Sequence, residues 1–270
     1  MSDFQHFLLT RFNVPFLSTD RAGVPTCTPE WMRHRFNLFE KFCYPSVRRQ
    51  TNQDFEWLVF FDANTEDEYG KRLDDYRNKF SAFRPIFVSD YPSLIPEIRR
   101  RIRSDTEYLI TSRVDNDDAI HREFISLVQE TFRDQKFEFV NFTQGLFLSD
   151  SKLYLCRHPS NAFVSLIEQV GEGSARTVWS TKHTTIRNVG HVHQIDDKPR
   201  WLCVVHERNA SNSPVVCSGY RSSAKRIAKW LLKRLMLLPN SKPVSSLQKK
   251  PLPLRLSDIA EQFGLEQIVS

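Results

Sequence analysis

Up to about residue 140, short apolar runs of β-forming residues alternate with longer amphipathic stretches. This alternation predicts strands that are separated by helices. The run Glu56–Phe61 is apolar at nearly every position, which is typical of a strand buried on both faces of a parallel sheet. We therefore predict an α/β fold with an open, mostly parallel sheet flanked by helices. The predicted strands are His6–Phe12, Glu56–Phe61, Arg84–Ser89 and Glu107–Ser112, and the predicted helices are Trp31–Phe42, Glu66–Lys79 and Pro96–Ser104.

The chain after residue 118 has a less regular pattern of apolar residues. Its composition changes near residue 210, so we divide the chain into a domain over residues 1–210 and a C-terminal extension over residues 211–270. The elements predicted in the second part of the domain are a helix over His121–Arg133, a β-meander over Phe137–Phe142 and Gly145–Leu155, a helix over Asn161–Val170 and a strand over Trp201–His206.

The composition of the 270-residue chain is that of a soluble globular protein, with 40% hydrophobic and 26% charged residues. No apolar run approaches the roughly 20 residues of a membrane-spanning helix, and the first residues lack the pattern of a signal peptide. We therefore expect a cytoplasmic protein. The five cysteines include no Cys-x-x-Cys pair, so we expect reduced thiols and neither a disulfide framework nor a zinc site. P-loop, dinucleotide-binding and Gly-x-Ser-x-Gly motifs are absent from the sequence.

The last part of the chain is strongly basic, with eleven lysines and arginines and no acidic residue between Glu207 and Asp258. Since the whole chain carries +6, the rest of it carries −5. Residues 222–238 have the pattern of an amphipathic helix, with Trp230 on its apolar face and lysines at a spacing of four. Such a helix either binds an anionic membrane surface, which would place the protein at the inner face of the membrane, or packs on protein. A Pro-containing linker and a short terminal helix over Leu256–Ile268 follow, and we expect no binding of nucleic acid.

Polar side chains follow three predicted strands at the point where each strand ends, in the clusters Thr10–Asn13, Asp62–Asp67 and Asp115–Asp118. Ligands of open α/β sheets bind outside the carboxyl ends of the strands, so we expect the clusters to face one crevice. The three carboxylates within Asp115–Asp118 repel one another unless a cation lies among them. Oxygen ligands favour Mg²⁺ or Mn²⁺, and Asp117 and Asp118 can also cap the following helix.

Three segments, His6–Asn13, Phe55–Asp62 and Thr111–Ile120, resemble those of the rhamnosyltransferase family of bacterial polysaccharide synthesis, whose members are GT-A-type glycosyltransferases. Ser112–Ala119 is the most specific part of the likeness. The resemblance implies a GT-A-like fold for the domain and the activity of a hexosyltransferase. Such an enzyme would transfer a sugar, rhamnose under this resemblance, from a nucleotide-sugar donor to a glycan or lipid-linked glycan acceptor, with inversion.

The same resemblance implies roles for individual residues. Asp115 and Asp117 would hold Mn²⁺ or Mg²⁺ on the diphosphate of the donor, and His206 would be an additional metal ligand. Negative charge builds on the diphosphate as it leaves, so a metal ion and a guanidinium would stabilise the transition state. Arg113 or one of the arginines within residues 99–103 could supply the guanidinium. The residues implied in nucleotide-sugar binding are Thr10, Arg11, Asn13, Asp62, Arg113 and Asp115.

The resemblance does not identify the catalytic base. Many related enzymes present it in a Glu-Asp pair after the metal motif, and this chain has no such pair there. A carboxylate or a histidine can accept the proton of the acceptor hydroxyl. The candidates are Glu172, in the loop between two glycines, and His183.

Two other classes of function are compatible with the sequence. A metal-dependent phosphotransferase or hydrolase could use the same acidic cluster on a nucleotide sugar. A non-enzymatic adaptor at the membrane surface could use the basic extension, while the acidic cluster would merely cap a helix.

Overall fold

The computed structural model describes residues 4–15, 19, 23, 25–65, 67–171, 175–206, 246–247 and 250–265. The amphipathic stretch 222–238 and Glu172 therefore lie outside the described residues. Within the described part of the chain, no helix is both long enough and apolar enough to cross a bilayer. Cys27 is exposed and three other cysteines of this part are buried, and all four are free thiols.

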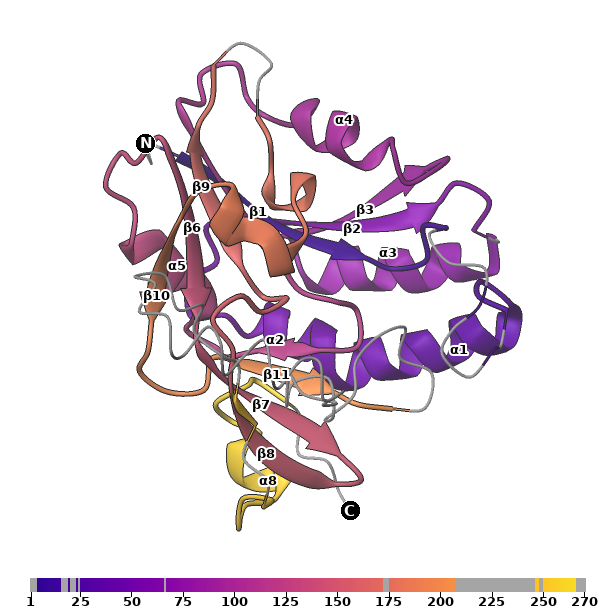
Figure 1. The fold of residues 1–270 in the computed structure, drawn as a ribbon. Coiled ribbons are helices and arrows are strands. Elements are labelled where there is room, and N and C mark those ends of the chain that lie inside the picture. Colours follow the sequence, from indigo (N-terminus) through magenta and orange to yellow (C-terminus); the bar gives the residue numbers. More distant parts are fainter. Residues whose placement is uncertain are drawn as a thin grey trace, which may run out of the picture.

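Seven strands of the described residues form the central sheet, in the order β10-β6-β9-β4-β1-β2-β3 (Figure 1). The four strands β1 to β4 are parallel to one another, and only β9 of this sheet runs antiparallel to its neighbours. The predicted α/β fold with a mostly parallel sheet is thus confirmed. The bounds are β1 (Phe4–Arg11), β2 (Glu56–Asp62), β3 (Phe83–Val88), β4 (Tyr108–Arg113), β6 (Phe137–Phe142), β9 (Ser165–Gln169) and β10 (His191–Ile195).

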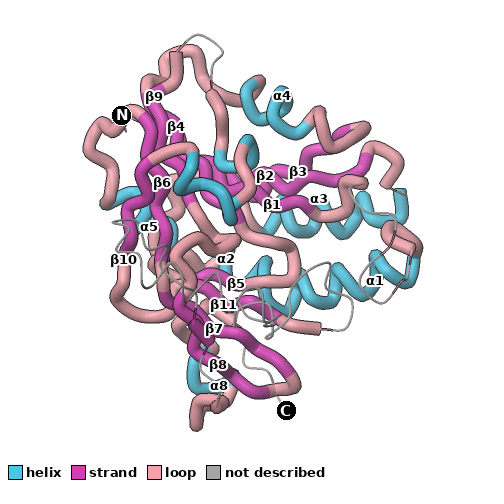
Figure 2. Tube along the Cα trace, in the orientation of Figure 1, coloured by secondary structure: helices cyan, strands magenta, loops and turns pink. Residues whose placement is uncertain are grey.

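Helices cover both faces of the central sheet and give a three-layered molecule (Figure 2). One face packs on an aromatic-rich core that includes residues of α1, α2, α3 and α5, and the other face packs on α4. A π-helical turn over Phe39–Cys43 joins α1 to α2. The bounds of the helices are α1 (Pro29–Leu38), α2 (Tyr44–Arg48), α3 (Gly70–Lys79), α4 (Leu94–Arg99) and α5 (Phe124–Glu130).

A second, smaller sheet has the order β12-β8-β7-β11-β5 in the described part of the chain. Gly145 on β7 provides room for the indole of Trp201 on β11, because a Cβ atom at residue 145 would lie 1.9 Å from that ring. The indole also stacks on Phe163, with ring centroids 5.1 Å apart. The bounds are β5 (Ala119–Ile120), β7 (Gln144–Ser149), β8 (Lys152–Arg157), β11 (Trp201–Val204) and β12 (Ser246–Leu247).

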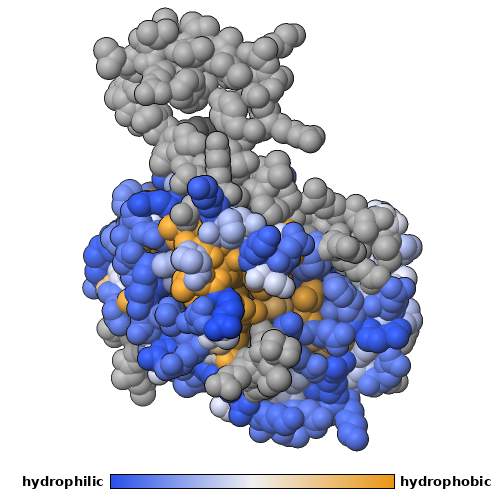
Figure 3. All heavy atoms as spheres, turned by 90° about the horizontal axis from the view of Figure 1, so that it is seen from below, coloured by the Kyte–Doolittle hydropathy of each residue, from blue (hydrophilic) through white to orange (hydrophobic). Residues whose placement is uncertain are grey.

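Part of the C-terminal extension packs on this second sheet. The backbone of β12 pairs with β8, and residues 250–265, which include α8 (Leu256–Ile259), continue along the same end of the molecule. Figure 3, which views this end from below, shows apolar side chains gathered among hydrophilic ones. The side chains that the segment buries against β7, β8 and β11 are Ile259, Ala260, Phe263 and Leu265.

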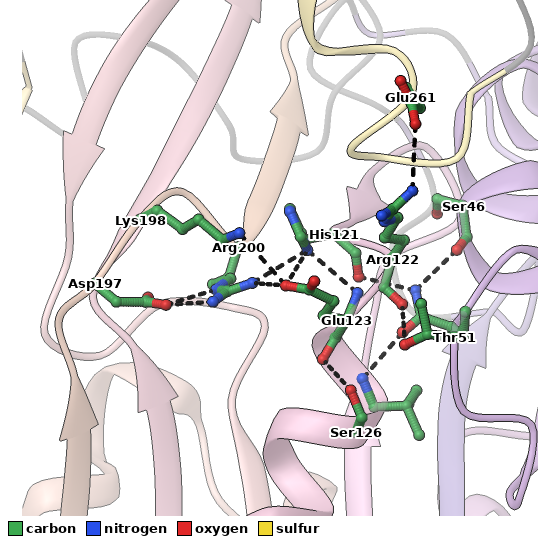
Figure 4. Close-up of polar contacts among 12 residues, drawn as sticks. Ser46, Thr51, His121, Arg122, Glu123, Ser126, Asp197, Lys198, Arg200 and Glu261 are labelled. Atoms are coloured by element: carbon green, nitrogen blue, oxygen red, sulfur yellow. Dashed lines mark hydrogen bonds and ion pairs between the residues drawn. The ribbon is translucent and has the colours of Figure 1, made fainter.

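A polar network connects the second sheet with the start of α5 (Figure 4). The Arg200 guanidinium donates to Glu123 at 2.7 Å and to His121 Nδ1 at 3.2 Å. Burial and the neighbouring Arg200 lower the pKa of His121 to about 4, so this ring is neutral at neutral pH. The adjacent Arg122 contacts Glu261 of the C-terminal segment at 3.4 Å. The network therefore connects residues 121–123 with the second sheet and with the C-terminal segment. These residues come just after Asp115–Asp118, which we call the acidic motif.

Two sequence-based predictions of secondary structure need correction. The predicted helix over Asn161–Val170 is wrong, because its second half forms strand β9. That strand lies between β4 and β6 and is buried on both faces, so its apolar residues lack a strand-like alternation. The predicted β-meander is also split, since β6 joins the central sheet while β7 and β8 form a hairpin in the second sheet.

Candidate active site at the carboxyl ends of the parallel strands

The carboxyl ends of β1 to β4 lie at one edge of the central sheet (Figure 1). β1 lies between β2 and β4, with Arg11 opposite Phe60 and Leu9 opposite Arg113. The three polar clusters identified in the sequence follow these strands, so they lie along the same edge. In open α/β sheets this edge is the usual place for ligands.

Asp117 is at the centre of the polar contacts at this edge. Its Oδ2 atom accepts a hydrogen bond from Arg35 Nη1 at 2.6 Å and one from His206 Nε2 at 2.9 Å. The other ring nitrogen of His206, Nδ1, lies 3.4 Å from Nε2 of His34. The side chains of Arg35 and Asp117 are only 9% and 6% exposed. Burial alone would raise the pKa of Asp117, but Arg35 and His206 together lower it below the usual carboxyl value.

Arg35 reaches this position because of the way α1 begins and packs. Thr28 caps the helix by accepting a hydrogen bond from the amide of Trp31, and Pro29 occupies the first turn. The buried face of α1 contains Trp31, Met32, Phe36 and also Arg35. Arg35 was not identified from the sequence. The available signal was a cation on the apolar face of an amphipathic helix, because charged side chains are almost never fully buried unless they are paired.

The other residues of the acidic motif hold the backbone around Asp117. Asp118 is 1% exposed, and its Oδ1 accepts a hydrogen bond from the amide of Val204 at 2.8 Å. Burial and the charges of Asp117 and Asp115 raise the pKa of Asp118 well above the usual carboxyl value. Asn116 donates to the carbonyl of Phe12 at 2.9 Å and thereby joins the motif to the end of β1.

Asp115 is the most accessible carboxylate of the motif, with a side chain that is 38% exposed. It forms an ion pair with Arg113 Nη2 at 3.1 Å. The arginines near residue 100 lie elsewhere. Both Arg101 and Arg103 contact Gln5 through their backbone, near the start of β1 and thus at the opposite edge of the sheet. Of the arginines proposed to face the diphosphate, Arg113 is the one at the carboxyl edge.

Thr10 and Asn13 use their side chains inside the protein. The Thr10 hydroxyl donates to the carbonyl of Val114 at 3.0 Å and accepts from Trp57 Nε1 at 2.9 Å, and the residue is fully buried. Asn13 donates to Thr65 and accepts from the amide of Asp62. These two side chains thus connect the end of β1 with the ends of β2 and β4, and their predicted role in nucleotide binding stays a prediction.

Arg11 and Asp62 are partly exposed at the ends of β1 and β2. The Arg11 guanidinium lies over the ring of Tyr91, 5.5 Å from its centroid. Tyr91, which follows β3, was not identified from the sequence, and it is 38% exposed. Asp62 Oδ1 accepts hydrogen bonds from the amide and the side chain of Asn64. The guanidinium of Arg11, the carboxylate of Asp62 and the ring of Tyr91 thus lie at or just after the carboxyl ends of β1, β2 and β3.

His183 lies close enough to the acidic motif for the charges of Arg113 and Asp115 to act on its ring. Its Nδ1 is 3.0 Å from the carbonyl oxygen of Ser160, and the Ser160 hydroxyl donates to the carbonyl of His183. A carbonyl can only accept, so Nδ1 carries the proton and Nε2 has a free lone pair. Burial and the charge of Arg113 lower the pKa of His183, against the effects of Ser160 and Asp115.

Glu172 lies outside the described residues, so of the two candidates for the base only His183 can be placed. The charges of Arg113 and Asp115 both act on the His183 ring, which therefore lies near the start of the acidic motif.

The side chains of the acidic motif do not form a metal site as they are arranged. Asp117 and His206 do lie together, as expected from the sequence, but Asp117 accepts hydrogen bonds from both His206 and Arg35. Asp115 is paired with Arg113. In the described part of the chain, no group of three or more His, Cys, Asp or Glu side chains could hold a metal ion. The expected Mn²⁺ or Mg²⁺ on Asp115, Asp117 and His206 thus does not fit this donor arrangement.

The fold is that of an α/β protein whose candidate ligand site, rich in carboxylates and arginines, lies beyond the carboxyl ends of parallel strands. The chain belongs to the family described as "Putative rhamnosyl transferase", whose model matches residues 5–218. The family is one of glycosyltransferases, so the expected family and enzyme class are confirmed.

Several solved structures are similar to this chain at low identity. S. aureus TarS is 12% identical, with 87% of this chain and 44% of TarS covered and a TM-score of 0.43. A structure of S. aureus TarS 1-349 in complex with UDP-GlcNAc is 11% identical, with 86% of this chain and 72% of that chain covered and a TM-score of 0.43. A "putative nucleotide-diphospho-sugar transferase" from Desulfovibrio desulfuricans G20 is 10% identical, with 87% and 95% covered and a TM-score of 0.40. The chain therefore spans less than half the length of TarS. A search of curated proteins gives no match.

Proposed function

We propose that this protein transfers rhamnose from a nucleotide-sugar donor to a glycan or lipid-linked glycan acceptor, with inversion at the anomeric carbon. The observation that carries the proposal is the family match over residues 5–218, because it includes every strand end at the carboxyl edge. The clustering of Asp115, Asp117, Arg35 and Arg113 at that edge supports it.

In this proposal, the nucleotide lies beyond β1 and β2. The ring of Tyr91 and the guanidinium of Arg11 offer a flat surface on which a nucleobase can stack. Asp62 accepts hydrogen bonds from the base or the ribose. Arg113 lies at the end of β4 and supplies positive charge toward the diphosphate, where negative charge builds as the sugar departs.

His183 accepts the proton in this proposal. The acceptor hydroxyl oxygen forms a bond to the anomeric carbon of the sugar while the bond from that carbon to the diphosphate oxygen breaks. The hydroxyl proton passes to His183 Nε2, and the nucleoside diphosphate leaves with the bonding electron pair. The hydrogen bond to Ser160 supports this role, because it fixes the tautomer that has its lone pair on Nε2.

The test is product analysis with UDP-, dTDP- and GDP-rhamnose and a glycan acceptor fraction from the source cells. We expect release of nucleoside diphosphate that depends on the acceptor, and acceptors that are one deoxyhexose heavier by mass spectrometry. Free rhamnose with unchanged acceptor would instead indicate a hydrolase. Unchanged donor in all three reactions, with no binding of any of the three nucleotides by calorimetry, would overturn the proposal.

We also propose that the lysine stripe of residues 222–238 brings the enzyme to anionic membranes. The charge of the sequence supports this proposal, since Lys225, Lys229 and Lys233 recur at helical spacing. Replacing these three lysines with Glu should abolish co-sedimentation with phosphatidylglycerol vesicles and leave transfer to a soluble acceptor intact. The matched control replaces three exposed lysines of the domain, Lys71, Lys79 and Lys152. Equal loss of vesicle binding in both variants would contradict the proposal.

A further inference from the structure

Each carboxylate of the acidic motif already has a partner within the protein. Arg113 pairs with Asp115 at 3.1 Å, Arg35 pairs with Asp117 at 2.6 Å, and the amide of Val204 donates to Asp118. Two guanidinium groups and a backbone amide therefore offset part of the repulsion expected from three neighbouring carboxylates, and the raised pKa of Asp118 reduces it further. An external cation is not required for this purpose.

The Arg35–Asp117 pair is buried and has further contacts that fix its position. The same Arg35 nitrogen that contacts Asp117 also donates to Asn116 Oδ1 at 3.2 Å. The guanidinium lies over the ring of Trp31, 5.0 Å from its centroid. Separating the pair would leave two uncompensated charges inside the protein, which is strongly unfavourable.

A divalent ion on Asp117 would have to compete with these contacts. It would replace Arg35 on Oδ2 or lie beside that guanidinium, and Arg113 on Asp115 is a second positive charge at the motif. His206 is also engaged, because a carboxylate can only accept and His206 Nε2 must therefore carry the proton in their 2.9 Å hydrogen bond. A protonated ring nitrogen has no lone pair for a metal.

We propose that Arg35 is the resident cation of the acidic motif, and that the protein binds the diphosphate of its donor without a divalent metal ion. Metal-free binding of the donor diphosphate rests on the proposed function. The assignment of Arg35 as the cation of the acidic motif does not depend on any donor. Arg35 acts as a positioning residue that fixes Asp117, and Arg113 provides the positive charge toward the diphosphate.

The first test measures binding of Mn²⁺ alone to the full chain, by the decrease of the free-ion signal in electron paramagnetic resonance. We expect wild type to bind no more Mn²⁺ than Asp117→Asn does. Tight stoichiometric binding in wild type that is lost in Asp117→Asn would overturn the inference. This comparison requires no donor, so it does not depend on the proposed function.

The second test measures binding of UDP, dTDP and GDP by calorimetry, in EDTA and in MnCl₂. For any nucleotide that binds, we expect the Kd values in the two buffers to agree within twofold. A Kd that is tenfold or more higher in EDTA would overturn the inference. If none of the three nucleotides binds in either buffer, the proposed function is contradicted. The comparison of Mn²⁺ binding between wild type and Asp117→Asn then still tests whether Arg35 is the resident cation of the acidic motif.

Variants of Arg35 sharpen both tests. Arg35→Gln leaves Asp117 without its counter-ion, so we expect this variant to gain Mn²⁺ binding, whereas Arg35→Lys should keep the wild-type result. Arg77→Gln is the matched control, because Arg77 forms an exposed ion pair on α3 and should change neither readout. Unchanged Mn²⁺ binding in a folded Arg35→Gln would contradict the role of Arg35. If that variant does not fold, the comparison of wild type with Asp117→Asn decides.

Discussion

Asp117 is the residue on which the arginine of α1 and the histidine after β11 converge. Asp117→Asn keeps the shape of the side chain and removes its charge, which leaves Arg35 as a buried cation without a counter-ion. Removing one partner of a buried ion pair costs about 3–5 kcal/mol, so we expect the free energy of unfolding to fall by that amount in urea titrations.

The double variant Arg35→Gln with Asp117→Asn is the control for this prediction. Because it removes both charges, its loss of stability should be clearly smaller than the sum of the two single losses. Agreement with the sum to within about 0.5 kcal/mol would mean that the two side chains are not coupled.

If His183 is the base, as proposed, the site has a predictable pH dependence. Burial and Arg113 hold the pKa of His183 below the ordinary histidine value of 6.5, so the ring is unprotonated and able to act as a base at neutral pH. As the pH falls through this lowered pKa, the ring takes up a proton and kcat should fall. His183→Ala should lower kcat by about 10²–10⁴-fold with little change in KM, and the decrease of kcat at low pH should disappear.

The matched control for His183 is His193→Ala, on β10. This variant should keep the wild-type pH profile of kcat. An acid decrease that persists unchanged in His183→Ala would assign the base to another residue.

At the scale of elements, the contact between β7 and β11 depends on the absence of a side chain. A Cβ atom at residue 145 would lie 1.9 Å from the Trp201 ring, which is also fixed by a hydrogen bond from its Nε1 to the carbonyl of Phe142. We expect Gly145→Ala to lower the free energy of unfolding by about 1–3 kcal/mol, measured by thermal unfolding with tryptophan fluorescence.

Gly70→Ala is the matched control, because no atom lies within 4 Å of the added carbon and the residue begins α3. Alanine is favoured over glycine in a helix by up to about 1 kcal/mol, so this variant should be at least as stable as wild type. Equal losses in the two variants would contradict the argument from packing.

The elements that sequence reasoning predicted best are those with a distinct boundary. β1 to β4 were each predicted to within two residues at either end, because apolar runs stop at polar clusters. β9 was missed because a strand buried on both faces has no alternation of apolar and polar residues. The strand ends also predicted where the polar clusters meet. The partner of Asp117 could not be predicted, because Arg35 is 82 residues away and only the packing of α1 brings it there.

At the scale of the whole molecule, two described segments of the basic extension pack on the second sheet. Residues 246–247 add a strand to the second sheet, and residues 250–265 cover the end of that sheet. The amide of Arg122, four residues after Asp118, donates to the carbonyl of Gln262 at 2.8 Å. The composition of the extension predicted its charge but not this packing, because docking depends on a surface formed by distant strands.

If residues 250–265 are an integral part of the fold, their buried side chains should contribute as much stability as core residues of the domain. Phe263 is 1% exposed and contacts the ring of His121, with centroids 5.8 Å apart. We expect Phe263→Ala to lower the free energy of unfolding by about 3–5 kcal/mol in urea titrations, with a single transition. Leu254→Ala, at a position that is 42% exposed in the same segment, should change it by less than about 0.5 kcal/mol. A Phe263→Ala variant as stable as the Leu254→Ala control would mean that the segment does not contribute to the stability of the folded domain.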